Sequence, residues 1–169
     1  MKKNFFLFIS LFFFSFMCQL YADTKTVFID LDFILTESSS GKKIIKHLND
    51  LNKENKDKIE SIEKKFKQEE NEIKSQKNII SSAEYKSKVD DFNIKINDFV
   101  LEKKEMLSKF ELEKKKTLDN FFLSLNLILK NYMEKNSIDI ILEKKGIVVA
   151  NSNNEISNDI LLLVNDNIN

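Results

Sequence analysis

The sequence contains no proline and no tryptophan, and it has only two glycines in 169 residues. So little glycine and proline leaves few residues for tight turns, which argues against a many-stranded barrel, a phosphate-cradling loop or a compact glycine-rich enzyme. All 27 basic residues are lysines and they face 27 acidic residues, so the formal net charge is zero. Because nucleic-acid-binding proteins usually carry a clear basic excess, we expect no nucleic-acid partner.

The first 22 residues have the three-part pattern of a secretory signal peptide. Lys2 and Lys3 precede an apolar run over residues 4–17, and Ala22 supplies the small residue that cleavage needs. The run is shorter than the roughly 20 residues that span a bilayer. We therefore predict cleavage after Ala22 and export of the mature chain, with lipid attachment at Cys18 or an uncleaved anchor as the alternatives.

The mature chain, residues 23–169, has 25 lysines and 27 acidic residues, which gives a net charge of −2. It contains no cysteine, so disulfides, thiol nucleophiles and thiolate metal sites are excluded. His47 is the single histidine, and no G-x-x-x-x-G-K-[ST] nucleotide motif occurs. We therefore expect no enzymatic activity, no metal and no cofactor.

Residues 25–35 alternate apolar side chains with Asp30 and Asp32, which predicts a half-buried strand with an acidic outer face. A pair of aspartates in D-x-D spacing also occurs in phosphatases of the haloacid dehalogenase type. The following hundred residues have a helical pattern, so they do not supply the further strands that such an enzyme needs. This segment and its loop form the first part of a small body, residues 23–41, and Ser40 is the predicted N-cap of the next helix.

Residues 42–136 are rich in Lys, Glu and Asn, with apolar residues three and four positions apart. Such a seam predicts an antiparallel coiled-coil hairpin of two helices. Two adjacent serines and a helix-start signal place its tip near residues 78–84. Arms of this length would be roughly 60–75 Å long, so the hairpin must project from the body.

Residues 137–169 are predicted to complete the body with a β-hairpin that turns at Gly146 and a short C-terminal helix that begins near Ser157. The fold class is thus α+β and mostly α. Three strands and one short helix bury too little apolar surface to be stable alone, so we expect self-association into a closed barrel of about three copies. The residues expected at this contact are Val27, Ile29, Leu31, Ile140, Leu142 and Val148.

The opening strand over residues 26–30, the charged hairpin and the closing residues 138–142, 146–151 and 157–160 resemble the Skp/OmpH family of periplasmic chaperones. The resemblance extends over essentially the whole mature chain. It implies a homotrimer whose helical tentacles enclose unfolded outer-membrane β-barrel proteins without ATP. Because members of that family are markedly basic and this chain is slightly acidic, we expect weak or no binding to membranes or lipopolysaccharide.

Aromatic and apolar residues of the hairpin are either seam core or client contacts, and those nearest the tip are the better candidates for contact. The candidate client-binding residues are Phe66, Ile73, Ile80, Tyr85, Phe92 and Phe99. The alternative function is a structural coiled-coil spacer of the cell envelope without chaperone activity. Such a spacer needs a seam that is apolar from end to end, whereas this seam becomes polar towards the tip.

Overall fold

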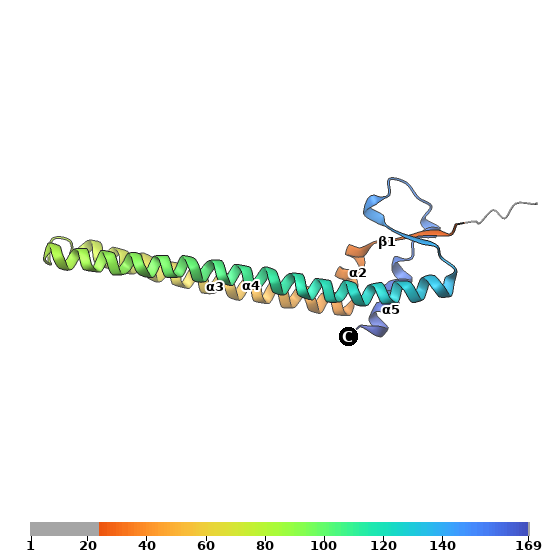
Figure 1. The fold of residues 1–169 in the computed structure, drawn as a ribbon, viewed down its shortest axis with the longest axis horizontal. Coiled ribbons are helices and arrows are strands. Elements are labelled where there is room, and N and C mark those ends of the chain that lie inside the picture. The colour runs from red at the N-terminus through yellow and green to blue at the C-terminus, as the bar shows by residue number, and fades with distance from the viewer. Residues whose placement is uncertain (1–23, 169) are drawn as a thin grey trace, which may run out of the picture.

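The structure is a computed structural model that describes residues 24–168, so the predicted signal peptide and its cleavage site after Ala22 lie outside the described residues. A small body carries one long arm of two helices that lie side by side (Figure 1). The predicted fold class is confirmed. The arm consists of α3 (Ser39–Gln76) and α4 (Ser82–Asn136), and the body of β1 (Thr26–Ile29), α2 (Leu31–Glu37), β2 (Ile140–Glu143), the 3-10 turns η1 (Lys144–Gly146) and η2 (Ser152–Asn154), and α5 (Ser157–Asn167).

The arm is far longer than the body is wide (Figure 1). α3 has 38 residues and α4 has 55, which correspond to about 57 and 83 Å at 1.5 Å per residue. The chain reverses between Gln76 and Ser82, where the Ser81 side chain caps α4 by accepting a hydrogen bond of 3.2 Å from the Glu84 N–H. α4 is the longer helix, and its last turns pack against the body.

The predicted strand over residues 25–35 is wrong beyond Ile29, because a helix replaces its second half. Asp30 is the N-cap of α2, and its Oδ1 accepts a hydrogen bond of 2.9 Å from the Phe33 N–H. Asp32 lies in the first turn, where the helix dipole favours an acidic side chain. The aspartates therefore start a helix, and the acidic strand face that the alternation predicted does not form.

Ser38, and not Ser40, is the N-cap of α3, because the Ser38 Oγ accepts from the Gly41 N–H at 3.1 Å. Ser40 lies inside the first turn of the helix. Gly41 allows a sharp turn from α2 into α3, since a Cβ at this position would lie 1.9 Å from the Leu35 carbonyl oxygen. The angle at which the arm leaves the body depends on this contact.

The predicted β-hairpin over residues 137–150 is also wrong in its second half. β2 pairs in parallel with β1, with Thr26 opposite Ile140, and the long arm is the crossover that parallel strands require. After β2 the chain enters η1, and residues 147–150 are not in a strand. Within residues 24–168 no strand pairs with residues 147–150, and Val148 is 98% exposed.

The body has a well-packed apolar core below the two strands. Ile34 of α2 and Ile160 and Val164 of α5 are 0% exposed, and Leu125 of α4 is 1% exposed. Ile156 joins this cluster, and its N–H donates a hydrogen bond of 2.9 Å to the Phe28 carbonyl. Helices from both ends of the chain are thereby fixed to the root of the arm.

Candidate functional site

Three of the predicted client-binding residues form an aromatic cluster between the two arm helices. The Phe66 ring lies edge-on to the rings of Phe92 and Phe99, with centroid distances of 5.9 and 5.4 Å. Phe92, Phe99 and Ile73 are buried, and Phe66 is half-buried. In the closed arm these side chains pack in the seam between α3 and α4, and their contact with a client stays a prediction.

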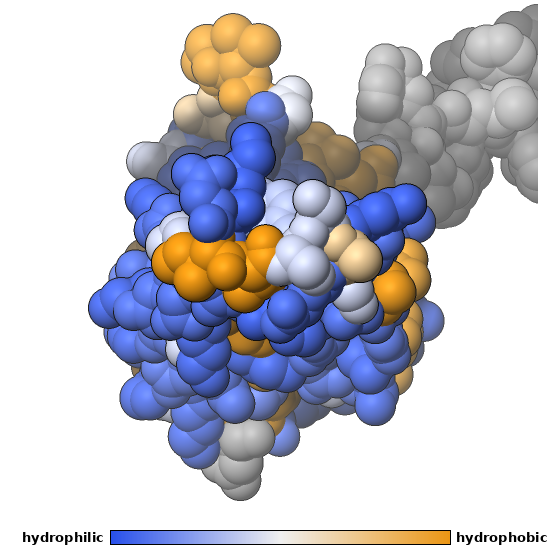
Figure 2. Space-filling view, turned by 90° about the vertical axis from the view of Figure 1, so that its left-hand side faces the viewer, coloured by the Kyte–Doolittle hydropathy of each residue, from blue (hydrophilic) through white to orange (hydrophobic). Residues whose placement is uncertain are grey.

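The tip carries the remaining predicted contacts, Ile80 and Tyr85, which are both half-buried. Ile79, which the seam pattern did not single out, is 78% exposed. Seen along the arm from the tip, the surface is mostly hydrophilic, with separate hydrophobic patches (Figure 2). The tip therefore offers small apolar contacts within a polar surface.

A line of exposed apolar residues on α4, here called the outer stripe, was also missed from the sequence. Each of its members follows a seam phenylalanine by two residues, which is about 200° around a helix. It therefore lies on the side of α4 that faces away from α3. The members are Ile94, Leu101, Leu112 and Leu123, with exposed fractions between 59% and 68%. The repeated Phe-x-Ile/Leu pairs are the sequence signal that could have found this stripe.

Charged side chains surround the outer stripe and also join the two arm helices. Glu105 pairs with Lys109 at 2.8 Å on the surface of α4. Between the arms, Lys58 pairs with Glu102 at 2.7 Å. Exposed pairs of this kind contribute at most about 1 kcal/mol each. The arm is thus held by a modest aromatic seam and by weak ion pairs.

The predicted oligomerisation residues fall into two groups. Val27 and Ile29 are buried in the core of their own chain, and Leu31 begins α2 and is half-buried. Contact of these residues with another copy stays a prediction. Ile140 and Leu142 are exposed on β2, beside a cleft of about 670 Å³ that reaches Leu129 and Met133 of α4. Within residues 24–168 the second edge of β2 has no strand partner, and Val148, which follows β2 and η1, is also exposed.

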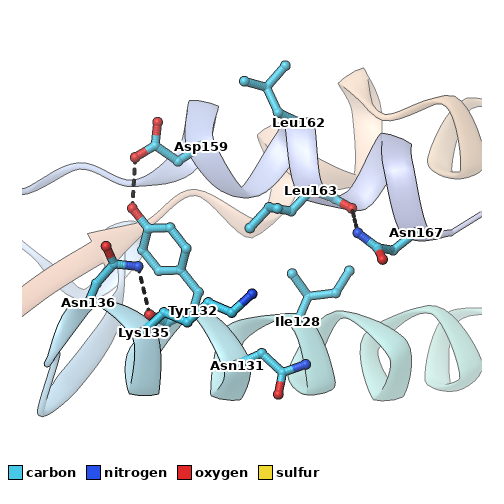
Figure 3. A pocket seen from close by; sticks show the side chains of 9 residues that line it. All are labelled: Ile128, Asn131, Tyr132, Lys135, Asn136, Asp159, Leu162, Leu163 and Asn167. Carbon is cyan, nitrogen blue, oxygen red and sulfur yellow. Dashed lines mark hydrogen bonds between the residues drawn. The ribbon is translucent and has the colours of Figure 1, made fainter.

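A second cleft, of about 500 Å³, lies between α4 and α5 (Figure 3). The Tyr132 hydroxyl donates a hydrogen bond of 2.8 Å to the Asp159 carboxylate. Burial, and then this hydrogen bond and the nearby negative charge, raise the pKa of Tyr132 to about 12. The Asn136 side chain donates to the Tyr132 carbonyl at 2.8 Å. The Tyr132–Asp159 hydrogen bond therefore joins the C-terminal helix to α4 across this cleft.

The two aspartates of the D-x-D segment are used in structural contacts. Asp30 caps α2, and its second oxygen lies 3.8 Å from Lys144, which also pairs with Glu155 at 2.8 Å. Asp32 pairs with Lys145 at 2.7 Å. Residues 24–168 contain no group of three or more His, Cys, Asp or Glu side chains arranged to hold a metal ion. In the same residues, no helix is both long and apolar enough to cross a membrane.

Comparisons with known proteins agree with this architecture. The fold is similar to that of an OmpH-like protein from Caulobacter crescentus that is described as a candidate outer membrane chaperone, with a TM-score of 0.78, 14% sequence identity and 87% of each chain covered. No curated protein matches the chain. The model of the family described as outer membrane protein (OmpH-like) matches residues 25–163. Since this match includes β1, the arm, β2 and most of α5, the chain belongs to the OmpH-like family.

Proposed function

We propose that this protein is an ATP-independent holding chaperone that binds unfolded outer-membrane β-barrel proteins in the periplasm and prevents their aggregation. Its family and its fold support a chaperone-type role. The observation that carries the proposal is the projecting arm, whose outer stripe presents separate apolar side chains within a charged surface. The proposed activity involves no catalytic step and no cofactor.

The spacing of the outer stripe suits weak contact at many points. An unfolded barrel strand presents an apolar side chain at every second residue, and an isolated leucine covers only one or two of them. Several such contacts on one client add up to useful avidity, although each one releases quickly. The charged residues between the leucines keep the apolar surface divided, which limits association of the arms with each other.

The proposed active form is a homotrimer. The exposed Val148 segment and the open edge of β2 are complementary, because an extended segment of one copy can add to the free strand edge of another. Ile140 and Leu142 would then be covered by the neighbouring copy. Replacing Val148 with Asp should prevent this contact, and light scattering should give a lower native mass for V148D than for the wild type.

The holding activity is tested by diluting a urea-unfolded outer-membrane β-barrel protein into the mature protein, residues 23–169, and measuring aggregation and native mass by light scattering. A soluble complex with one client per oligomer supports the proposal. A stable oligomer that leaves the client to aggregate contradicts it. That result would favour the second candidate, a structural spacer of the envelope.

The surface that binds the client is tested by a triple variant of the outer stripe, Leu101→Gln, Leu112→Gln and Leu123→Gln. Glutamine keeps good helix propensity, so the arm should still fold. The matched control places glutamine at three exposed polar sites of α4, Ser87, Asn97 and Ser108. We expect the stripe variant to lose at least tenfold in client affinity and the control to bind normally. Equal binding by both variants would assign the client to another surface, such as an opened seam.

A further inference from the structure

A small cleft lies at the root of the arm, and no residue of the outer stripe or of β2 lines it. It has a volume of about 290 Å³ and lies between the first turns of α3, residues 117–124 of α4 and the residue that follows α5. Ile44, Phe121 and Ile168 give it apolar walls, and Ser40, Lys43 and Asn120 bring polar groups to it. Nothing in the proposed chaperone function uses this cleft.

The Ser40 hydroxyl is the unusual group in this cleft. Ser40 is 4% exposed, and its Oγ has no hydrogen-bond partner within residues 24–168. It is the one buried side-chain polar atom of the described chain left in this state. Buried hydroxyls are almost always hydrogen-bonded, because burial removes the water that would otherwise satisfy them. An unpartnered hydroxyl that lines a cleft therefore points to a ligand that binds there.

The charges around Ser40 indicate the kind of ligand. Ser40 lies in the first turn of α3, at the positive end of a 38-residue helix that carries no acidic residue in that turn. Lys43, one turn further on, forms no ion pair within the described residues, whereas Lys42 pairs with Glu37 and Lys46 with Asp50. The local electrostatic field thus favours an anion beside Ser40 and Lys43.

The α4 side of the cleft supplies hydrogen-bonding groups and one acidic contact. The Asn120 amide lines the cleft, and the Ser124 hydroxyl donates to the Asn120 backbone carbonyl at 3.1 Å. Thr117 also lines it, and its hydroxyl makes a long contact of 3.4 Å with the Glu113 carboxylate. Glu113 itself does not line the cleft. The lining groups are therefore one cation and several neutral donors.

We propose that this cleft binds a small oxyanion of the size of phosphate, held by the Lys43 ammonium group and the Asn120 amide. The Ser40 hydroxyl, which is covered and unpartnered in this rotamer, would rotate about χ1 to donate to the bound anion. A bound anion would link α3 to α4 at the point where both helices leave the body, and so it would stiffen the root of the arm. The proposal concerns free inorganic anions, and the phosphate group of a lipid is the competing source of the same chemistry.

The test is a titration of the mature protein with inorganic phosphate, followed by calorimetry and by thermal unfolding at constant ionic strength in chloride. We expect saturable binding at millimolar phosphate and a melting temperature that rises with phosphate concentration. Lys43→Gln and Ser40→Ala should each weaken binding at least tenfold. Lys46→Gln, on the same helix but outside the cleft, should bind as the wild type does. No saturable binding, or equal binding by all four proteins, would overturn the proposal.

Two further measurements distinguish a free-anion site from a structural role of Ser40 and from binding of a lipid headgroup. Without phosphate, S40A should be at least as stable as the wild type, because the substitution removes an unpartnered buried hydroxyl; a large loss of stability would show that the hydroxyl has a structural partner instead. Flotation with phosphatidylglycerol vesicles tests the lipid source. Binding to vesicles that K43Q abolishes, without binding to free phosphate, would contradict the free anion. Neither measurement depends on client binding, so the proposed anion site and the proposed chaperone function can be disproved independently of each other.

Discussion

The body and the arm are built from the same few residue types but are stabilised in different ways. In the body, Ile34, Ile160 and Val164 are fully buried in a core shared by elements from both ends of the chain. In the arm, the best-covered side chains, such as Phe92 and Phe99, still keep 8–9% exposure and pack against one partner helix. The body is therefore a compact anchor, and the long arm that it holds has fewer buried apolar contacts of its own.

This difference matters for the proposed function because a surface that adapts to many clients has to be less rigid than the part that holds the assembly together. Regions with few buried apolar contacts open locally at low free energy, whereas a core opens only with the whole domain. We therefore expect opening of the arm to be separable from unfolding of the body. Substitutions in each region can test that separation directly.

The largest effect is expected from Ile160→Ala in the body core. Removing most of a fully buried isoleucine leaves a cavity among α2, α4 and α5, and such substitutions cost about 2–5 kcal/mol. Leu162→Ala is the matched control, since Leu162 lies on the same helix and is 65% exposed. Urea unfolding at one fixed protein concentration should give a much lower midpoint for I160A alone. Equal midpoints for the two variants would show that the body core is not the anchor.

A smaller and more local effect is expected from Phe99→Ala in the arm. This change removes the closer of the two aromatic contacts with Phe66, and we expect a loss of about 1–3 kcal/mol, below the usual cost for a fully enclosed phenylalanine. Leu101→Ala, two residues further on the exposed face, is the control. Hydrogen exchange followed by mass spectrometry should show faster exchange in α3 and α4 but unchanged exchange in β1 and α5. Faster exchange throughout the chain would mean that the arm and the body unfold as one unit.

The same contrast explains what the sequence predicts well and what it does not. The hairpin follows from the three-four spacing of residues such as Phe92, Phe99 and Phe110, because local periodicity fixes helix pairing. The strand prediction around Asp30 is wrong because apolar and acidic residues alternate there, and this alternation fits a strand as well as a capped helix. The capping hydrogen bond to the Phe33 N–H decides between them, and the Asp30 N–H also donates to the Ser157 hydroxyl at 2.9 Å, a long-range contact that the local pattern does not show.

The exposed surfaces were harder to predict for a related reason. A seam pattern identifies the buried side of a helix, but it does not show which apolar residues remain outside it, as Leu101 and Leu112 do. The segment over residues 147–150 has strand-like sequence, yet a strand needs a partner edge, and none within the described residues pairs with it. Sequence composition gives the propensity of a segment, whereas pairing depends on what lies beside it.

At high pH, Tyr132 tests the link between the C-terminal helix and α4. Its pKa is raised to about 12 in the folded protein, chiefly by burial and then by the Asp159 carboxylate, from an ordinary value near 10. Its contribution to stability is therefore fully present below pH 10 and is lost as the pH rises towards 12. Tyr132→Phe should make the decline of the urea midpoint between pH 10 and 12 less steep than in the wild type. Equal slopes for the variant and the wild type would contradict the assignment.

The smallest effect is expected from the ion pairs between the arm helices. Lys103 and Glu63 lie 2.8 Å apart, with side chains 40% and 53% exposed, so solvent and salt screen their attraction. A double-mutant cycle with Lys103→Gln and Glu63→Gln should give a coupling of about 0.2–1 kcal/mol, measured from local exchange in the arm, and 0.5 M salt should reduce it further. A coupling comparable to the loss in F99A would mean that charge, and not the aromatic seam, holds the arm closed. The arm would then open with rising salt, and client binding should change with ionic strength in parallel.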